Sequence, residues 1–348
     1  MSGTDPAQHP LWLERVYSDD SLVTQCMTHP SLTTVRQQPL LVSTSSSTMP
    51  SLMARMLEAL DVRDGHRVLE IGTGTGYNAA LLCHRLGSDN VVSIDIDPTL
   101  VTAARDHLAS LGHHPTLVVG DGAAGVAQHP PYDRILATAA VPEIPLPWIA
   151  QLAPGGKILA NLRGELAGGT LCLLTKDGDD EVIGPVLPLG GHFMWLRPKP
   201  GSPLRAPEPS HIRSSRYAAR TSTTLDPSTL VSNDSFRFLL QLHLRGARSF
   251  CRTRVYHPHT RTTCDGVLIE AFDGSHAEVI TDPELDARRP VIQAGPRPLW
   301  DSVETTYQLW CHLDRPDPGR FGVVANHTTQ FVWFDTDEGW YRWPLPLA

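Results

Sequence analysis

The sequence predicts an α/β protein, with a doubly wound sheet followed by a smaller α+β domain. Two observations predict the sheet. Short apolar runs that are typical of buried parallel strands alternate four times with segments of helical periodicity, and the first run leads into the glycine-rich turn GTGTG at 72–76. A third observation marks the boundary: residues 198–209 hold five prolines, which is typical of a connector.

The region before the connector divides near residue 50. Residues 1–50 are predicted as an N-terminal substrate and active-site segment, in which WLERVYSDDSLVTQCM forms a short helix followed by irregular chain. Residues 51–196 are predicted as the central domain, which begins with an amphipathic helix at 51–60. Its further elements, in order, are strand RVLEIG, helix TGYNAALLCHRLG, strand VVSIDID, helix PTLVTAARDHLASLG, strands TLVVGDG and YDRILATAA, a short helix WIAQLAPGG, and a hairpin of KILANLRG and TLCLLTKDG.

The region after residue 196 is predicted as a connector at 197–220 and an accessory domain at 221–348. The connector carries five arginines and one lysine, which either meet acidic groups of a peptide substrate or simply solvate the chain. The accessory domain is expected to hold helices near 234–244 and 298–313, a strand pair near 266–281 turning at Asp273 and Gly274, and a final hairpin. We expect the aromatic residues of that hairpin to form a small core rather than a binding platform: Trp333, Phe334, Trp340, Tyr341 and Trp343.

Composition narrows the class of protein. The chain has 348 residues, of which 41% are hydrophobic and 19% charged, and its net charge is -8. An acidic chain of this kind is disfavoured as a general nucleic-acid binder, because such binders neutralise phosphates. No apolar stretch approaches the ~18 residues of a membrane span, and the polar N-terminus does not resemble a signal peptide.

Cysteine and histidine patterns argue against disulfides and metals. The six cysteines are scattered, and Cys83 and Cys172 lie in apolar runs that predict buried free thiols. A reducing, cytoplasmic location is therefore expected. The 16 histidines lack the spaced acidic or cysteine partners of a known metal site, so no metal is predicted.

The glycine turn is the strongest functional signal. Its G-x-G-x-G spacing differs from the G-x-G-x-x-G of dinucleotide-binding proteins, and Tyr77 follows the last glycine, which disfavours a nicotinamide dehydrogenase. Three acids end successive strands: Glu70, then Asp95, which can accept both hydroxyls of a ribose, then Asp121, placed to read an adenine amino group. Acids without a basic residue among them suit a cationic adenosine ligand without phosphate, such as S-adenosylmethionine. The alternative is a generic glycine turn with the acids as helix caps.

Four segments together resemble one family. VLEIGTGTGYNAALL, VVSIDIDPTLV, VVGDGAAG and YDRILATAAVPEIPLPWIAQLAPGGKIL are similar to the protein-L-isoaspartate O-methyltransferase family over about residues 16–195. The resemblance implies a Rossmann-like class I methyltransferase fold and methyl transfer from S-adenosyl-L-methionine, with S-adenosyl-L-homocysteine as product, to an aspartate- or isoaspartate-type carboxylate of a peptide. The cofactor contacts it implies are Glu70, Gly72, Thr73, Gly74, Gly76, Asp95, Asp121 and Gly122.

The resemblance also gives a meaning to the six consecutive hydroxyl side chains at 43–48. The family carries a Thr-x-Ser-x-Pro element whose Ser hydroxyl lies at the transfer site. Aligning its Pro with Pro50 places Thr48 on that Ser and Ser46 on the Thr, so Thr48, with Ser47 and Ser46, is the expected catalytic group. The alternative is that Thr48 or Ser51 merely caps the following helix. The expected substrate contacts are Ser45, Thr138, Ala139 and Arg197.

The C-terminal extension of about 150 residues and the N-terminal VYSDDSLVTQ resemble an actinobacterial subfamily found alongside ribosomal peptide biosynthesis. That resemblance predicts esterification of an aspartate in a modified precursor peptide of the lanthipeptide, lasso or graspetide type. The next backbone nitrogen then attacks the methyl ester, methanol leaves, and a succinimide (aspartimide) forms, which persists or hydrolyses to isoaspartate. Two alternatives stay open: a general isoaspartate repair methyltransferase with an accessory domain, and a non-catalytic peptide-binding protein that retains the fold. Oligomeric state is not predicted.

Overall fold

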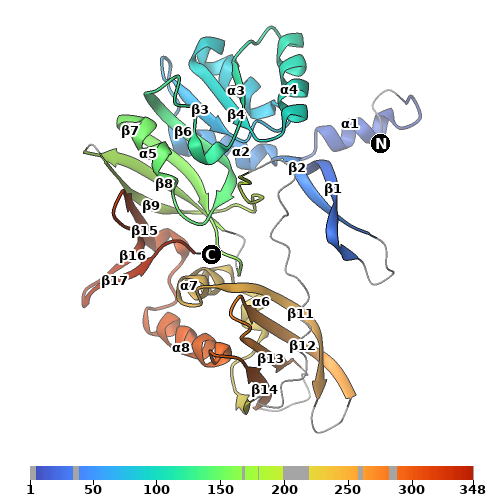
Figure 1. Cartoon of the computed structure of the whole chain (residues 1–348), viewed down its shortest axis with the longest axis vertical. Helices are drawn as coiled ribbons and strands as arrows, with labels where there is room; N and C mark the ends of the chain where they lie inside the picture. The colour runs from blue at the N-terminus through green and yellow to red at the C-terminus, as the bar shows by residue number, and fades with distance from the viewer. Residues whose placement is uncertain are drawn as a thin grey trace. The chain divides into compact units, whose positions relative to one another are not determined.

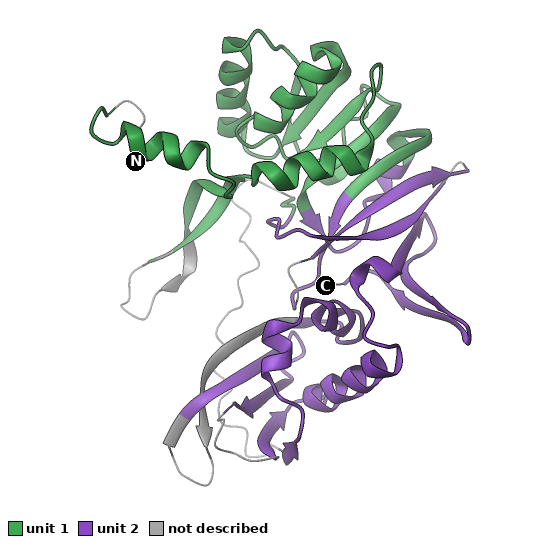
Figure 2. Ribbon diagram, turned by 180° about the vertical axis from the view of Figure 1, so that it is seen from behind, with its two compact units in different colours: residues 1–139, 150–159, 196–204 green, residues 140–149, 160–195, 205–348 purple. Residues whose placement is uncertain are grey.

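The computed structural model in Figure 1 describes residues 5–33, 39–166, 169–178, 180–198, 219–257, 262–281 and 288–347. Most of the predicted connector, residues 199–218, lies outside these ranges. The chain forms two compact units. Unit 1 comprises residues 1–139, 150–159 and 196–204, and unit 2 comprises 140–149, 160–195 and 205–348 (Figure 2). This division differs from the predicted boundaries at 50, 196 and 220.

Unit 1 contains the predicted alternation of parallel strands and helices. Its elements are β3 (Val68–Ile71), α3 (Tyr77–Leu86), the short helix η1 (Ser88–Asn90), β4 (Val91–Asp95), α4 (Pro98–Ser110), β5 (Thr116–Val119), η2 (Gly122–Ala124) and most of β6 (Tyr132–Val141). The strands pair in parallel in the order β6-β3-β4-β5. Their carboxyl ends therefore share one edge, as the sequence predicted.

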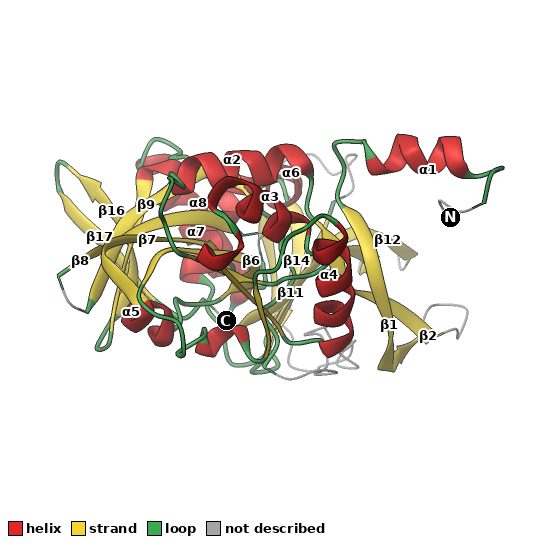
Figure 3. Ribbon diagram, turned by 90° about the horizontal axis from the view of Figure 1, so that it is seen from above, coloured by secondary structure: helices red, strands yellow, loops and turns green. Residues whose placement is uncertain are grey.

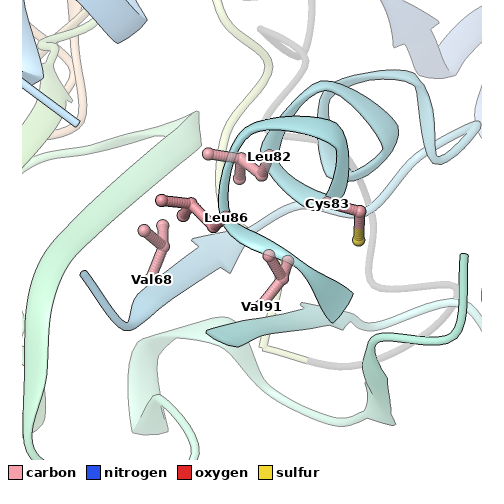
Figure 4. Packing of buried hydrophobic residues seen from close by; sticks show 5 residues of the cluster. All are labelled: Val68, Leu82, Cys83, Leu86 and Val91. Carbon is pink, nitrogen blue, oxygen red and sulfur yellow. The ribbon is translucent and has the colours of Figure 1, made fainter. Parts of the chain in front are cut away.

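Helix α3 covers strands β3 and β4 through an apolar cluster (Figure 4). Leu82, Cys83 and Leu86 recur on one face of the helix and pack against Val68 and Val91, all five being at most 8% exposed. The prediction that Cys83 and Cys172 are buried free thiols is confirmed. The cluster fixes the helix on the sheet and hence fixes the glycine turn between them.

The N-terminal region of unit 1 is more regular than predicted. It contains α1 (His9–Val16), β1 (Leu22–Thr33), β2 (Pro39–Ser47) and α2 (Pro50–Leu60). The expectation of irregular chain after the first helix was wrong, because β1 and β2 run side by side as an antiparallel pair (Figure 3). The pairing satisfies the backbone of a hydroxyl-rich segment that carries little hydrophobic signal of its own.

The start of α2 contradicts the capping alternative for the hydroxyl run. Met49 occupies the N-cap position and makes no side-chain cap. Neither Thr48 nor Ser51 caps the helix through its side chain; instead, the Ser51 backbone N–H donates to Oδ1 of Asp19, at 2.8 Å, in the turn before β1. The hydroxyl run thus ends a strand and is not consumed by the helix.

A ten-stranded sheet has the order β17-β16-β15-β9-β8-β7-β6-β3-β4-β5. Its remaining strands are β7 (Leu152–Leu162), β8 (Thr170–Asp177), β9 (Glu181–Gly190), β15 (Phe321–Asn326), β16 (Gln330–Thr336) and β17 (Gly339–Pro344). The helix α5 (Leu146–Gln151) precedes β7. The helix predicted over WIAQLAPGG was placed too late, because β7 starts at Leu152 and Pro154 cannot continue a helix. Strand β9 was not predicted.

Unit 2 also holds a five-stranded sheet in the order β10-β14-β13-β12-β11. Its elements are β10 (Ala219–Thr223), α6 (Ser228–Ser232), α7 (Asp234–His243), β11 (Ala247–His257), β12 (Thr262–Ala271), β13 (His276–Ile280), β14 (Arg289–Ala294), α8 (Leu299–His312) and η3 (Pro318–Arg320). The two predicted helices and the strand pair turning at Asp273 and Gly274 are present.

The last three strands do not belong to the five-stranded sheet. Strand β15 pairs antiparallel with β9, with Val324 opposite Ile183, so the predicted final hairpin extends the ten-stranded sheet instead. Of its aromatic residues, Phe334 and Trp343 are 2% and 6% exposed and belong to the core, whereas Trp340 is 55% exposed. The expectation of a small aromatic core is correct for the first two and not for Trp340. Among the described residues, none of the helices combines the length and the apolar composition that a membrane span requires.

Candidate functional site

The glycine turn between β3 and α3 needs glycine for two different reasons. Gly72 has φ +99°, and a Cβ there would lie 2.5 Å from Oγ1 of Thr138. Gly76 has φ +85°, and a Cβ there would meet the Cβ of Ala104 at 3.2 Å. The first glycine lets β6 approach the turn, and the second lets α4 pack on the start of α3.

Glu70, at the end of β3, lies fully buried beneath the turn. Asn78 Nδ2 donates to one carboxylate oxygen at 2.7 Å and Ser93 Oγ donates to the other at 2.5 Å. Burial raises the pKa of Glu70 to about 7, against the lowering effect of these two hydrogen bonds and with a smaller contribution from the charge of Asp95. Its carboxyl group therefore braces the turn from within. Thr73, 4% exposed, joins this network through the Oγ of Ser93 at 2.6 Å.

Asp95 ends β4 beside the turn. Its carboxylate accepts the backbone N–H of Gly74 at 2.9 Å and that of Asp97 at 3.1 Å. The cap of α4 is a different acid, Asp97, which accepts from the backbone of Thr99. The structure thus holds the Asp95 carboxylate at the strand edge, as predicted, without using it as a helix cap.

Asp121 follows β5 and is adjacent in space to the end of β4, because the N–H of Gly120 donates to the carbonyl of Asp95 at 2.9 Å. Its Oδ1 accepts the backbone N–H of Ala123 at 2.9 Å and caps η2. Gly122 is buried, and a Cβ there would lie 2.6 Å from Ile71. The three acids therefore lie at the carboxyl ends of neighbouring parallel strands, and the alternative that the acids are helix caps is correct for Asp121.

The hydroxyl run reaches the same edge. Ser45, 4% exposed, accepts a hydrogen bond from Oγ1 of Thr24 at 3.0 Å, and its Oγ would lie 3.8 Å from a Cβ at Gly74. Beyond it, Ser46, Ser47 and Thr48 line a small cavity against the glycine turn. The sequence prediction that this run lies next to the turn is consistent with this geometry.

That cavity has a volume of about 30 Å³, roughly the space of one water molecule. Its lining consists of glycines, hydroxyls, one amide, one acid, one methionine and one tyrosine: Ser46, Ser47, Thr48, Met53, Glu70, Gly72, Thr73, Gly74, Thr75, Tyr77, Asn78 and Thr138. No lysine or arginine is among these lining residues. No side-chain cation of this lining would therefore oppose a positively charged group.

The remaining predicted contacts are not equivalent. Thr138 lines the cavity, but its hydroxyl lies 3.0 and 2.9 Å from the carbonyls of Ile71 and Gly72 and is committed as a donor to them. Ala139 is the next residue of β6 and is not in the lining. Arg197 reaches β2, where its Nη2 donates to the carbonyl of Thr44 at 3.2 Å.

Three residues of this region were missed from the sequence: Asn78, Ser93 and Gln25. Asn78 and Ser93 hold Glu70, and both are polar residues on otherwise apolar, buried faces, a signal that was available. Gln25 accepts from Thr44 at 2.7 Å and donates to Asp97 at 2.9 Å, linking the hairpin to α4. Nothing local in the sequence indicates that link. Within the described ranges, no group of three or more His, Cys, Asp or Glu side chains is placed to hold a metal.

Parallel strands in the order β6-β3-β4-β5, a glycine turn after β3 and an acid at the end of β4 define a class I methyltransferase fold. The comparisons identify the family. Residues 23–187 match the model for "Protein-L-isoaspartate(D-aspartate) O-methyltransferase (PCMT)". The chain is 42% identical over 151 residues to the protein-L-isoaspartate O-methyltransferase of Methanoculleus marisnigri, covering 42% of this chain and 68% of that protein. It therefore belongs to the protein-L-isoaspartate O-methyltransferase family.

Two further similar proteins show how much of the chain the similarity covers. The chain is 46% identical over 112 residues to protein-L-isoaspartate O-methyltransferase 2 of Archaeoglobus fulgidus, which is 32% of this chain and 51% of that protein. It thus spans about half the length of that relative. A solved structure titled protein-L-isoaspartate O-methyltransferase aligns over 93% of this chain and 89% of its own, with a TM-score of 0.50 and 23% identity. This likeness concerns the fold alone, but it extends into the C-terminal region.

Proposed function

We propose that the chain is an S-adenosylmethionine-dependent carboxyl O-methyltransferase that esterifies an isoaspartyl carboxylate of a polypeptide. The observation that carries the proposal is the position of Ser46, Ser47 and Thr48 against the glycine turn. Hydroxyl groups placed beside the cofactor turn can orient one oxygen of a carboxylate without neutralising it. Family membership supports the reaction class.

The residues present fit the cofactor. The turn at 72–76 offers backbone N–H groups, and Asp95 is held at the strand edge by two backbone donors with lone pairs left for ribose hydroxyls. Asp121 ends the next strand, where an adenine amino group would be read. The lining without lysine or arginine suits a sulfonium. When bound, S-adenosylmethionine supplies a methyl group that a carboxylate oxygen accepts, leaving S-adenosylhomocysteine.

The role of the chain is then to position the substrate. A carboxylate is already ionised at neutral pH, so no general base is required. Orientation and partial desolvation provide the acceleration. The hydroxyls of Ser46 and Ser47, at the end of β2, and of Thr48, just after it, supply the orientation. Of the lining hydroxyls, that of Thr138 is committed to two carbonyls and that of Thr73 lies 2.6 Å from the Oγ of Ser93. We assign the donor role to the hydroxyls at 46–48 because they match the family's hydroxyl element.

The cofactor assignment has a direct test in Asp95→Asn. The asparagine keeps one side-chain oxygen that can accept a backbone N–H group, but it lacks the negative charge that would hold the ribose hydroxyls. We expect the dissociation constant of S-adenosylhomocysteine, measured by calorimetry, to rise at least about ten-fold, the usual effect of losing a hydrogen bond to a charged group. Asp89→Asn, an exposed acid in η1, is the matched control. An unchanged constant in Asp95→Asn would refute the ribose role.

The reaction is tested with two peptides that differ only in the linkage of one residue, isoaspartyl in one and aspartyl in the other. The full chain with S-adenosylmethionine should form the methyl ester of the isoaspartyl peptide, detected by mass spectrometry, and little of the other. Absence of ester from both, with cofactor binding intact, would favour a non-catalytic peptide-binding protein.

A second candidate is the tailoring of an aspartate in a modified precursor peptide, leading through the methyl ester to aspartimide or isoaspartate. The observation that favours it is Thr48, where the family carries serine; its extra methyl makes the site narrower and stiffer. The C-terminal region does not discriminate between the two candidate functions, because a structure titled protein-L-isoaspartate O-methyltransferase aligns over 93% of this chain. Efficient methylation of arbitrary isoaspartyl peptides would exclude this candidate, and methylation restricted to a constrained aspartyl peptide would favour it.

A further inference from the structure

Unit 2 contains a second cavity, with a volume of about 340 Å³, which lies within the range of ligand-binding sites. It is formed where the start of β8, the end of β9, the first turn of α7 and η3 come together. Its lining residues are Gly169, Thr170, Leu187, Pro188, Leu189, Gly190, His192, Asp234, Ser235, Phe238, Asp317 and Pro318. Gly169, Thr170 and Leu187 lie within the range 23–187 that the family model matches, and the other nine lining residues lie beyond it. The methyl-transfer chemistry gives the cavity no role.

The charged groups of the cavity are acidic. Asp234, at the start of α7, forms an ion pair with Arg237 one turn along the helix. Asp317 differs from it: its Oδ1 accepts from Oγ of Ser235 at 2.9 Å, and it has no ion pair within the described ranges. Asp317 is exposed, and its carboxylate has no cationic partner among the described residues.

A buried hydroxyl is unsatisfied at the same place. Thr170 is 7% exposed, and its Oγ1 has no hydrogen-bond partner among the described residues. Buried polar groups in folded proteins are nearly always paired, so a hydroxyl of this kind in the wall of a cavity indicates a missing donor or acceptor. This observation is independent of the two acids.

The rest of the wall is apolar and firmly held. Phe238, 2% exposed, packs edge-on against Phe321 with ring centroids 5.1 Å apart. Pro188 lies where a Cβ at Gly319 would approach to 3.3 Å, so η3 is fitted closely to the end of β9. Apolar walls with an acid beside them suit a long side chain with an aliphatic stem and a cationic head.

The one imidazole in the lining does not oppose a cation. Desolvation of the ring, followed by the charges of Arg163 and Arg237, lowers the pKa of His192. The ring is therefore neutral at pH 7 and offers a hydrogen bond rather than a competing positive charge.

We propose that this cavity binds a cationic side chain of a polypeptide, an arginine guanidinium or a lysine ammonium. Asp317 pairs with its charge, Thr170 accepts a further N–H, and Leu187, Pro188 and Phe238 cover its stem. The inference rests on the proposed function only in naming a polypeptide as the ligand. An anionic ligand is disfavoured by the Asp317 carboxylate.

The test uses the full chain and four blocked pentapeptides of alanine with one central residue: arginine, lysine, the neutral isostere citrulline, or norleucine. Binding is followed by ligand-observed NMR titration, which needs no methyl transfer. We expect at least one cationic peptide to bind about ten-fold or more tightly than both neutral peptides. Comparing arginine with lysine identifies the head group.

Two variants locate the binding. Asp317→Asn should abolish the preference for the cationic peptide and Thr170→Val should weaken it, whereas Asp335→Asn, which removes an exposed carboxylate of the same unit, should leave it unchanged. Equal binding of cationic and neutral peptides by the wild-type chain would overturn the proposal. So would an unchanged preference in a folded Asp317→Asn variant, verified by circular dichroism. Failure of methylation with intact cationic binding would refute the proposed function but not this site.

Discussion

Glu70 is a carboxyl group whose protonation is set by its burial in the fold. Its folded-state pKa of about 7 exceeds its ordinary value of 4.5 because the carboxyl group is fully buried. Between these two values the unfolded chain releases the proton while the native chain keeps it, so this group makes stability fall as the pH rises from 4.5 to 7. The difference between the two pKa values corresponds to a loss of about 3 kcal/mol in the free energy of unfolding, and this loss is complete above pH 7.

Replacing Glu70 with Gln tests this linkage. The amide keeps an acceptor for Asn78, and its NH₂ can donate to Ser93, whose own proton then turns to Thr73. We expect urea midpoints of Glu70→Gln to exceed those of the wild type at pH 8 and to converge with them near pH 5. Glu58→Gln, exposed on α2, should follow the wild type at every pH. Parallel pH profiles for the wild type and Glu70→Gln would contradict the raised pKa.

Thr48 is the hydroxyl to test first for catalysis. Thr48→Val removes the donor but keeps the shape, so turnover should fall about ten-fold or more while affinity for S-adenosylhomocysteine changes little. Thr48→Ser restores the hydroxyl and should retain turnover. If Thr48→Val turns over normally, the working donor lies at Ser46 or Ser47, and the Ala variants of these two serines in the same assay would identify it.

The predicted and missed residues of the site differ in a physical way. Gly72, Gly76 and Asp95 were predictable because each follows from what a strand end or tight turn needs locally. Gln25 was not, since its partner Asp97 is 72 residues away and the contact depends on how the hairpin folds back. Asn78 was predictable in part, because its polarity on a buried helix face is visible in the sequence but its partner, Glu70, is not.

At the scale of elements, the start of α2 depends on a residue outside the helix. Asp19 accepts the backbone N–H of Ser51, and hydrogen bonds from the backbone and then from the side chain of Ser51 lower the pKa of Asp19 below 3.8. A carboxyl group with a lowered folded-state pKa stabilises the native chain above its unfolded pKa, and that contribution is lost as the pH falls through the folded value. The cap therefore operates at neutral pH.

Asp19→Ala should lower the thermal midpoint at pH 7, because an orphan N–H at the start of α2 loses its acceptor. The difference from the wild type should shrink on acidification below about pH 4. Asp20→Ala is the matched control: it removes the adjacent exposed acid, whose ion pair with Arg15 lies on the surface and contributes little. Equal losses in the two variants would refute the capping role.

Elements were predicted well where they carry their own pattern. The helices α3 and α4 have buried faces that recur with the helical period, and the strands β3 and β4 are short continuous buried runs. Strand β1 was not predicted, because its order depends on pairing with β2, a hydroxyl-rich partner with no apolar alternation. Strand β9 contains Pro185 and Pro188, which disfavour a strand locally, yet it pairs on both sides.

For the molecule as a whole, the chain's last strands return to a sheet that begins more than 250 residues earlier. Five residue pairs join β15 to β9, from Gly322 with Pro185 to Asn326 with Glu181. A pairing between strands this far apart in the sequence produces no local sequence pattern. For this reason, residues 221–348 were predicted as a separate domain. Phe321, 2% exposed, lies at the start of β15 and packs on Phe238, Phe334 and Trp343.

Phe321→Ala therefore tests whether the C-terminal strands are integral to unit 2. Loss of a buried phenylalanine costs about 3–5 kcal/mol where the surroundings cannot collapse, and here it also frees Phe238, which forms part of the wall of the larger cavity. We expect a large fall in the urea midpoint, monitored by tryptophan fluorescence, and weaker binding of the cationic pentapeptides. Phe272→Ala, at a position 61% exposed, should change neither. If both variants unfold like the wild type, packing of β15 through Phe321 does not stabilise unit 2.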